Sequence, residues 1–238
     1  MKKFEGIFTV LVTAYDESGG IDHTAMKALT KYQINSGVHG LVVLGSNGEC
    51  PYLTPDLQKS AVDVVMETCA GALPVIVGVN ERGTDAAIER ALYAKNAGAD
   101  GLLLALPVFY PLDEEAVYRH YETICSRVDL PVLFYNFPSH SHLVLSPEQI
   151  ARIAQIKNVV GAKETIFKTS EVKALVDAAD KEFSVFTGIC LNLTKTVGVG
   201  ACGAICPLPN VAPQTAVRLY EALKAGDLEG AAPTGRDQ

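Results

Sequence analysis

Short apolar runs alternate with longer, helix-like stretches along the whole chain. Eight such runs, rich in β-branched and aliphatic residues, occupy positions 7–13, 40–44, 74–78, 101–105, 132–135, 159–162, 184–187 and 203–205. Each is followed by a polar or Gly/Pro turn and then by a helical candidate, at 22–36, 54–70, 84–97, 113–126, 146–154, 169–178, 191–199 and 213–225. Runs that are apolar on both faces and alternate with helices predict parallel strands covered by helices.

Capping residues support the helix boundaries. Thr54 precedes Pro55, and Ser146 precedes Pro147, so each pair has an N-cap residue followed by proline at the first helical position. Gly98 stands just past the end of another predicted helix, where glycine is favoured. These capping residues indicate that the periodic stretches are separate helices.

The number of strand and helix pairs predicts the fold class. Eight βα units in about 225 residues match a closed (β/α)8 TIM barrel, an α/β fold. A doubly wound open sheet is the alternative, but the regular spacing of the strands and the lack of a glycine-rich dinucleotide loop count against it. We expect a barrel domain over residues 1–227 and a short tail over 228–238.

Composition and charge exclude several classes of partner. The chain has 238 residues, of which 48% are hydrophobic and 20% charged, as in ordinary globular proteins. Its net charge of −7 and the absence of a basic cluster argue against binding to nucleic acid. The first residues do not resemble a signal peptide, and no apolar segment is long enough to span a bilayer. We therefore expect a cytoplasmic protein without a membrane partner.

The cysteines are scattered and form no CxxC pair: Cys50, Cys69, Cys125, Cys190, Cys202 and Cys206. Cys202 and Cys206 flank an apolar strand-like stretch, where we expect free thiols that pack as small hydrophobic groups. This pattern indicates a reducing compartment.

In a TIM barrel the chemistry lies at the carboxyl ends of the strands. Lys163 follows the run 159–162 and precedes polar residues, so its amine can be desolvated and still meet a ligand. Burial lowers the pKa of a lysine and leaves a free amine able to attack a carbonyl. The segment alone favours a lysine that snorkels to solvent, and the rest of the chain reverses that interpretation.

Two other strand ends carry plausible chemistry. Tyr135 ends the strand next to that of Lys163, and its phenol can transfer protons, although a tyrosine can also simply pack at a barrel rim. The turn from Gly45 to Gly48 contains Ser46 and Asn47, whose backbone N–H groups can bind a carboxylate. Such turns are also common connectors, so the motif is weak by itself.

No metal site is predicted. The five histidines show no metal-ligand spacing beyond His140-Ser141-His142, which we interpret as a loop feature.

Taken together, several segments make the chain resemble the dihydrodipicolinate synthase/N-acetylneuraminate lyase superfamily, over roughly residues 4 to 230. The segments that carry the resemblance occur in the expected order: Thr13-Ala14, Gly45-Ser46-Asn47-Gly48-Glu49, Tyr135-Asn136-Phe137-Pro138, Gly161-Ala162-Lys163-Glu164 and Gly203-Ala204-Ile205.

The resemblance implies a class I aldolase mechanism that joins pyruvate, or another 2-oxo acid, to an aldehyde or reverses that reaction. Lys163 would form the Schiff base and Tyr135 would be the general acid/base. Ser46 and Asn47 would hold the carboxylate. The remaining pocket would be lined by the backbone of Gly188 and Ile205. The resemblance implies no cofactor, because the protonated imine is itself the electron sink, and it implies a homodimer or homotetramer.

Departures from the family pattern bear on the second substrate. His140 stands where lysine-biosynthetic members have an arginine, so the bidentate contact with a carboxylate is lost, although His140 remains a substrate-binding candidate. Phe109 stands where those members have a tyrosine that relays protons, which leaves the neighbouring Tyr110 as a candidate relay. Asn47 replaces the usual threonine and is more similar to the 4-hydroxy-2-oxoglutarate and sugar-acid aldolases.

Three functions are therefore compared. The leading one is a Schiff-base lyase acting on a 2-oxo acid. The alternatives are a 4-hydroxy-tetrahydrodipicolinate synthase, which condenses pyruvate with aspartate semialdehyde, and a non-catalytic binder of 2-oxo acids. The resemblance also implies a small C-terminal helical domain, and this chain, which ends soon after Gly230, would lack most of it.

Overall fold

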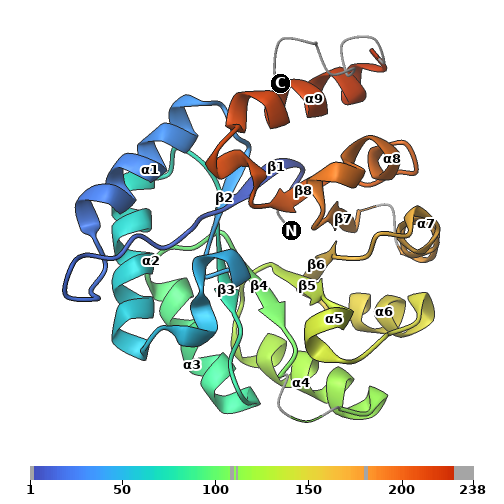
Figure 1. Ribbon diagram of the computed structural model, residues 1–238. Coiled ribbons are helices and arrows are strands. Elements are labelled where there is room, and N and C mark those ends of the chain that lie inside the picture. The colour runs from blue at the N-terminus through green and yellow to red at the C-terminus, as the bar shows by residue number, and fades with distance from the viewer. Residues whose placement is uncertain (1–2, 108–109, 111, 180–181, 228–238) are drawn as a thin grey trace.

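The computed structural model describes residues 3–107, 110, 112–179 and 182–227. Its eight parallel strands pair in sequence order and close into a barrel, with the helices arranged around it (Figure 1). The strands are β1 (Gly6–Val10), β2 (Gly40–Val43), β3 (Val75–Val79), β4 (Gly101–Ala105), β5 (Val132–Asn136), β6 (Val159–Glu164), β7 (Ser184–Thr187) and β8 (Gly203–Cys206). The predicted TIM barrel is confirmed, and the open sheet is excluded by the pairing of β1 with β8.

The helices follow the strands as predicted. The long ones are α1 (His23–Asn35), α2 (Pro55–Cys69), α3 (Thr84–Asn96), α4 (Glu114–Arg127), α6 (Pro147–Ala154), α7 (Thr169–Ala178) and α9 (Pro213–Ala225). Two short helices, α5 (Pro138–Ser141) and α8 (Leu193–Val197), and four 3-10 turns, η1 (Ser46–Gly48), η2 (Cys50–Tyr52), η3 (Cys190–Asn192) and η4 (Leu208–Asn210), complete the described elements. Predicted caps are present: the hydroxyls of Thr54 and Ser146 accept hydrogen bonds from the first turns of α2 and α6.

Alternate residues of each strand separate two apolar layers. Inside the barrel a compact cluster gathers residues such as Phe8, Leu133, Phe186 and Ile205, together with the ring of Tyr135. A much larger cluster fills the space between the strands and the helices. The barrel interior is thus a packed core that extends to Tyr135 at the carboxyl ends of the strands.

The strand boundaries differ most from prediction in β1 and β6. β1 ends at Val10 rather than at residue 13, because Val12 has left the barrel wall and is exposed. β6 continues to Glu164 and so includes Lys163, because the polar residues still pair with β5 and β7. The helix predicted over 191–199 is divided into η3 and α8.

The prediction of a free thiol at Cys206 is wrong. Cys206 ends β8 and forms a disulfide with Cys190, which follows β7, with 6.2 Å between their Cα atoms. The pairing was not visible from the spacing, because it depends on the strand ends lying side by side. Cys202 is a free thiol, as predicted. The disulfide removes one observation that favoured a reducing compartment.

Two predictions concern residues outside those described, namely Phe109 and the tail 228–238. Within the described ranges, no helix is long and apolar enough to cross a membrane.

Candidate active site

A cavity of about 1160 Å³ opens at the carboxyl end of the barrel. Its wall includes four of the residues predicted from the sequence: Ser46, Tyr110, Tyr135 and His140. They come from turns or loops after β2 and β4, from β5 and from α5. The cavity is therefore at the edge where parallel barrels position functional side chains.

Lys163 lies beneath this opening, in the layer of inward-facing side chains nearest the carboxyl ends of the strands. Its side chain is only 2% exposed, and its Nζ lies 4.1 Å from the centre of the Tyr135 ring. Burial lowers the pKa of the Lys163 amine to about 7, because the charged ammonium has lost its hydration. A substantial fraction of the amine is therefore neutral near pH 7.

Tyr135 is the direct neighbour of Lys163 across the β5–β6 pair. Burial raises the pKa of its phenol, and a hydrogen bond with Ser46 opposes that shift. The two hydroxyl oxygens of Tyr135 and Ser46 lie 3.4 Å apart. The phenol thus keeps its proton at neutral pH, with its ring beside the amine and its hydroxyl near the turn after β2.

The turn that holds Ser46 is fixed by an unusual backbone. Leu44, which directly follows β2, has φ 61°, a left-handed conformation that is rare for a residue of its size. Its carbonyl accepts a hydrogen bond of 3.0 Å from the Asn80 amide. Gly78 allows this close approach, since a Cβ there would come within 2.0 Å of the same carbonyl oxygen.

Below the turn, the Thr13 hydroxyl donates to the carbonyl of Gly48 at 2.6 Å. Ser46 and Asn47 begin η1, and the first N–H groups of a helical turn have no acceptor within it. These two groups are suited to an anion such as a carboxylate.

Gly188 provides the space beside the lysine. Its N–H donates to the carbonyl of Glu164 at 2.7 Å, which holds the chain against β6. A Cβ at position 188 would lie 3.0 Å from Cε of Lys163 and 2.2 Å from the hydroxyl of Thr165. Only glycine therefore leaves both side chains in their places.

The other predicted residues occupy different positions. Ile205 is fully buried in the inner cluster below the cavity, and Asn47 is exposed. The imidazole of His140 stacks on the ring of Phe137 with 3.7 Å between centroids. Tyr110 is 72% exposed at the cavity wall. His140 and Tyr110 therefore lie at the outer part of the cavity, away from the buried amine.

Several supporting residues were missed by the sequence analysis. Leu44 and Asn80 fix the turn after β2, and neither has a recognisable sequence signal. Asn136 and Glu164 form a buried hydrogen bond of 2.7 Å directly beyond Tyr135 and Lys163. The available signals were the adjacent polar pairs 135–136 and 163–164 and their place in two segments that carry the family resemblance.

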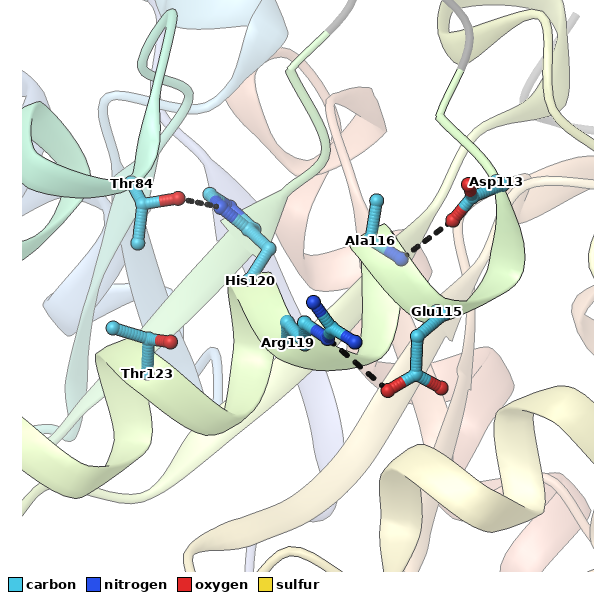
Figure 2. Close-up of a pocket in the computed structure, with 7 residues that line it drawn as sticks. All are labelled: Thr84, Asp113, Glu115, Ala116, Arg119, His120 and Thr123. Atoms are coloured by element: carbon cyan, nitrogen blue, oxygen red, sulfur yellow. Dashed lines mark hydrogen bonds and ion pairs between the residues drawn. The ribbon is translucent and has the colours of Figure 1, made fainter.

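A second hollow, of about 400 Å³, lies against α4 in the helical layer (Figure 2). Several of its polar groups have structural partners, since Asp113 caps the N–H of Ala116 and Arg119 pairs with Glu115. Nε2 of His120 is buried and has no hydrogen-bond partner among the described residues. His120 bonds Thr84 at 3.0 Å, and burial lowers the pKa of His120 to about 4, so the ring is neutral. This hollow has the character of a packing feature of the helical layer.

The arrangement at the barrel mouth suits covalent chemistry on a carbonyl compound. A neutral amine is the nucleophile for such a carbon, a phenol beside it can exchange protons, and N–H groups nearby can hold an anion. The described residues contain no cluster of three or more metal-binding side chains.

Comparison with known proteins places the chain in a family. The family model described as the dihydrodipicolinate synthetase family matches residues 3–236. A 4-hydroxy-tetrahydrodipicolinate synthase of Nitrobacter hamburgensis is 33% identical over 225 residues, which are 94% of this chain and 76% of that protein. A probable 2-dehydro-3-deoxy-D-pentonate aldolase of Escherichia coli K12 is 34% identical over 236 residues, covering 98% of this chain and 78% of that protein.

Solved structures agree with the sequence relatives. A dihydrodipicolinate synthase of Thermotoga maritima superposes with a TM-score of 0.93 at 32% identity, over 97% of this chain and 79% of that one. A prophage protein of the dihydrodipicolinic acid synthase family from Escherichia coli K12, solved in complex with pyruvate, gives 0.93 at 30% identity, over 96% and 78%. The chain belongs to the dihydrodipicolinate synthetase family, whose members are named as synthases, lyases and aldolases.

Proposed function

We propose that this enzyme is a Schiff-base lyase, in which Lys163 forms an imine with pyruvate or a related 2-oxo acid and thereby makes or breaks a carbon–carbon bond to an aldehyde. The observation that carries the proposal is the buried Lys163 amine, whose pKa is lowered to about 7 beside the Tyr135 ring. The similar prophage protein was solved with pyruvate, which supports this choice of 2-oxo acid.

The reaction would begin when the free amine of Lys163 attacks the ketone carbon. The resulting carbinolamine would lose its hydroxyl as water, with a proton donated by the Tyr135 phenol through Ser46 or directly. The Tyr135 phenolate left by this step would then take a proton from the adjacent methyl group, which gives an enamine and restores the phenol. In the condensing direction the enamine carbon attacks the aldehyde, and water finally releases the product from the lysine.

Substrate binding would divide between the two ends of the cavity. The N–H groups of Ser46 and Asn47 would hold the carboxylate of the 2-oxo acid, while Gly188 leaves room for the imine. Ile205, which belongs to the inner apolar cluster, would form the apolar base. His140 and Tyr110, at the outer wall, would meet the aldehyde portion, and Tyr110 is a candidate for relaying protons.

The curated relatives favour two kinds of aldehyde. One relative is named a 4-hydroxy-tetrahydrodipicolinate synthase and another a probable 2-dehydro-3-deoxy-D-pentonate aldolase. The aldehyde would be aspartate semialdehyde in the first reaction and a short aldehyde in the second. His140 cannot make the two parallel hydrogen bonds that an arginine makes to a carboxylate. We therefore favour the lyase over the synthase.

The test is to incubate the protein with pyruvate, reduce it with borohydride and map the modified peptide by mass spectrometry. An adduct on Lys163 is expected. A modified lysine elsewhere, or no adduct on the folded protein, would contradict the proposal and would favour a non-catalytic relative. Release of pyruvate from 4-hydroxy-2-oxo acids, compared with consumption of aspartate semialdehyde, then separates the lyase from the synthase.

A further inference from the structure

The outer face of the barrel wall carries a second buried polar pair, immediately beside the catalytic candidates. In the pairing of β5 with β6, Tyr135 is opposite Lys163 and Asn136 is opposite Glu164. Successive residues of a strand point to opposite faces, so Asn136 and Glu164 face the helical layer. Each of these two side chains is only 2% exposed.

One hydrogen bond of this pair is formed, and two of its atoms are unpartnered. The Asn136 amide donates to Oε2 of Glu164 at 2.7 Å. Oε1 of Glu164 and Oδ1 of Asn136 are both buried and have no hydrogen-bond partner among the described residues. Both are acceptors when Glu164 is ionised, so no donor is available to either atom within the pair.

A single proton resolves both deficits. Protonated Glu164 becomes a donor at Oε1 and keeps Oε2 as an acceptor for the Asn136 amide. A carboxylic acid and an amide can then pair through two hydrogen bonds, and no buried charge remains. We propose that Glu164 is held as a neutral carboxylic acid paired with Asn136, and that this pair is a positioning element for Tyr135 and Lys163.

The surrounding charges agree with a neutral Glu164. Burial is the largest influence and raises the pKa of Glu164 to about 7, whereas the Asn136 hydrogen bond and the Thr165 N–H lower it in part. Glu171 of α7 raises it further. Lys163 on the same strand points to the opposite face. The remaining charged or titratable groups on α5 to α7 and in the turn after α6 are exposed: His140, His142, Glu148, Arg152, Lys157, Lys173 and Asp177.

The pair lies where the strand register needs support. The β5–β6 register shifts between Val132 and Leu133, so β6 has one extra residue before the site. A slip by one residue would turn Lys163 to the outer face and Glu164 inward, because side chains alternate with a period of two. The Asn136–Glu164 bond, one residue beyond Tyr135 and Lys163, fixes the register at the site itself.

The neutral state also has an electrostatic consequence, and this part of the inference rests on the proposed function. A carboxylate beside Lys163 would stabilise the ammonium and raise the lysine pKa. A neutral acid holds the same geometry and leaves the amine free to react.

Infrared spectroscopy of the unliganded protein tests the proton directly. At pH 6 an ordinary glutamate is ionised, so we expect wild type to show a carboxylic-acid carbonyl band that is absent from Glu164→Gln. The matched control is Glu171→Gln, which should keep the band. If wild type has no such band, or if Glu164→Gln retains it, Glu164 is ionised and the proposal is wrong. Carbon-13 NMR of labelled glutamate in wild type decides the same question if the variant does not fold.

The positioning role is tested by trapping with pyruvate and borohydride. Glu164→Gln can reproduce both hydrogen bonds, so its trapping rate should stay within about threefold of wild type at pH 7, whereas Glu164→Leu should lose at least about tenfold. Circular dichroism must show that both variants are folded. Equal rates in all three proteins, or equal losses in the two variants, would overturn the role. Failure of wild type to be trapped would contradict the proposed function alone, since the infrared result does not depend on pyruvate.

Discussion

Two neighbouring residue pairs on the same two strands experience opposite surroundings. Tyr135 and Lys163 point into the barrel, beneath a cavity open to ligands, whereas Asn136 and Glu164 point into the packed layer between strands and helices. Burial acts on both pairs and shifts both pKa values toward neutral groups, downward for Lys163 and upward for Glu164. Desolvation on the inner face thus favours a neutral, nucleophilic amine. Desolvation on the outer face favours a neutral acid that hydrogen-bonds Asn136 and holds the two strands in register.

The largest effect is expected from removing the amine of Lys163, which disrupts the inner pair. Lys163→Ala should abolish covalent capture of pyruvate, because no other amine occupies that position, and it should leave the barrel folded, because it removes a desolvated amine. Mass spectrometry after borohydride reduction measures the capture, and circular dichroism measures the fold. Lys157→Ala is the control, since Lys157 is exposed at the turn before β6 and its loss should leave capture unchanged. Capture by folded Lys163→Ala would move the nucleophile elsewhere.

The next largest effect is expected from removing the hydroxyl group of Tyr135. Tyr135→Phe keeps the ring next to the lysine and deletes the hydroxyl that lies near Ser46. Turnover should fall by about 10²–10⁴-fold, the range for a positioned acid or base, with the fold preserved. Steady-state assays with the substrate identified by screening give this number. Tyr93→Phe serves as the control because it removes a hydroxyl that donates to the exposed residue Asp63 in the helical layer. Unchanged turnover would exclude Tyr135 from proton transfer.

A smaller effect tests the space beside the lysine. In Gly188→Ala the new Cβ would press on Cε of Lys163 and on the Thr165 hydroxyl. Overpacking of this kind costs about 1–3 kcal/mol in the free energy of unfolding, and the displaced amine should be trapped about tenfold more slowly. Chemical denaturation and trapping kinetics measure the two quantities. Gly83→Ala, which meets nothing within 4 Å, is the comparison. A Gly188→Ala protein equal to wild type in both would show that this space is not needed.

The two pairs also differ in how far they could be predicted. The barrel followed from eight apolar runs because a strand buried on both faces has a continuous apolar sequence. Adjacent parallel strands with nearly equal ends bring Tyr135 and Lys163 together, so the inner pair was accessible. The outer pair was not, because Asn136 and Glu164 lie past the ends of the apolar runs 132–135 and 159–162, and no pattern indicated that they face each other. In the structure Asn136 is the last residue of β5 and Glu164 the last residue of β6, and the two are paired across these strands.

Other parts of the site depend on contacts that no local pattern encodes. Leu44 adopts its left-handed backbone because Asn80, 36 positions later, holds its carbonyl and Gly78 leaves space for it. The Cys190–Cys206 disulfide depends likewise on the ends of β7 and β8 lying side by side. Local propensity cannot predict such features, since each arises only after the barrel has closed.

The last prediction separates the pairs by the pH dependence of stability. The Lys163 pKa is lowered from 10.5 to about 7, so between these values the unfolded state binds the proton and the folded state does not. The free energy of unfolding should therefore rise with pH in that window. The Glu164 pKa is raised from 4.5 to about 7, so the folded state holds the extra proton there and the free energy of unfolding should fall as pH rises from 4.5 to 7.

Each group should contribute a slope of about 1.4 kcal/mol per pH unit within its window. Urea denaturation from pH 5 to pH 10 gives the curves, and subtracting each variant from wild type isolates one group. Lys163→Ala should remove the rise above pH 7, and Glu164→Gln should remove the fall below it. If either difference is flat across its own window, the corresponding side chain titrates as in the unfolded chain. Desolvation would then have neutralised a side chain on only one face of the barrel wall, and the comparison of the two pairs would not hold.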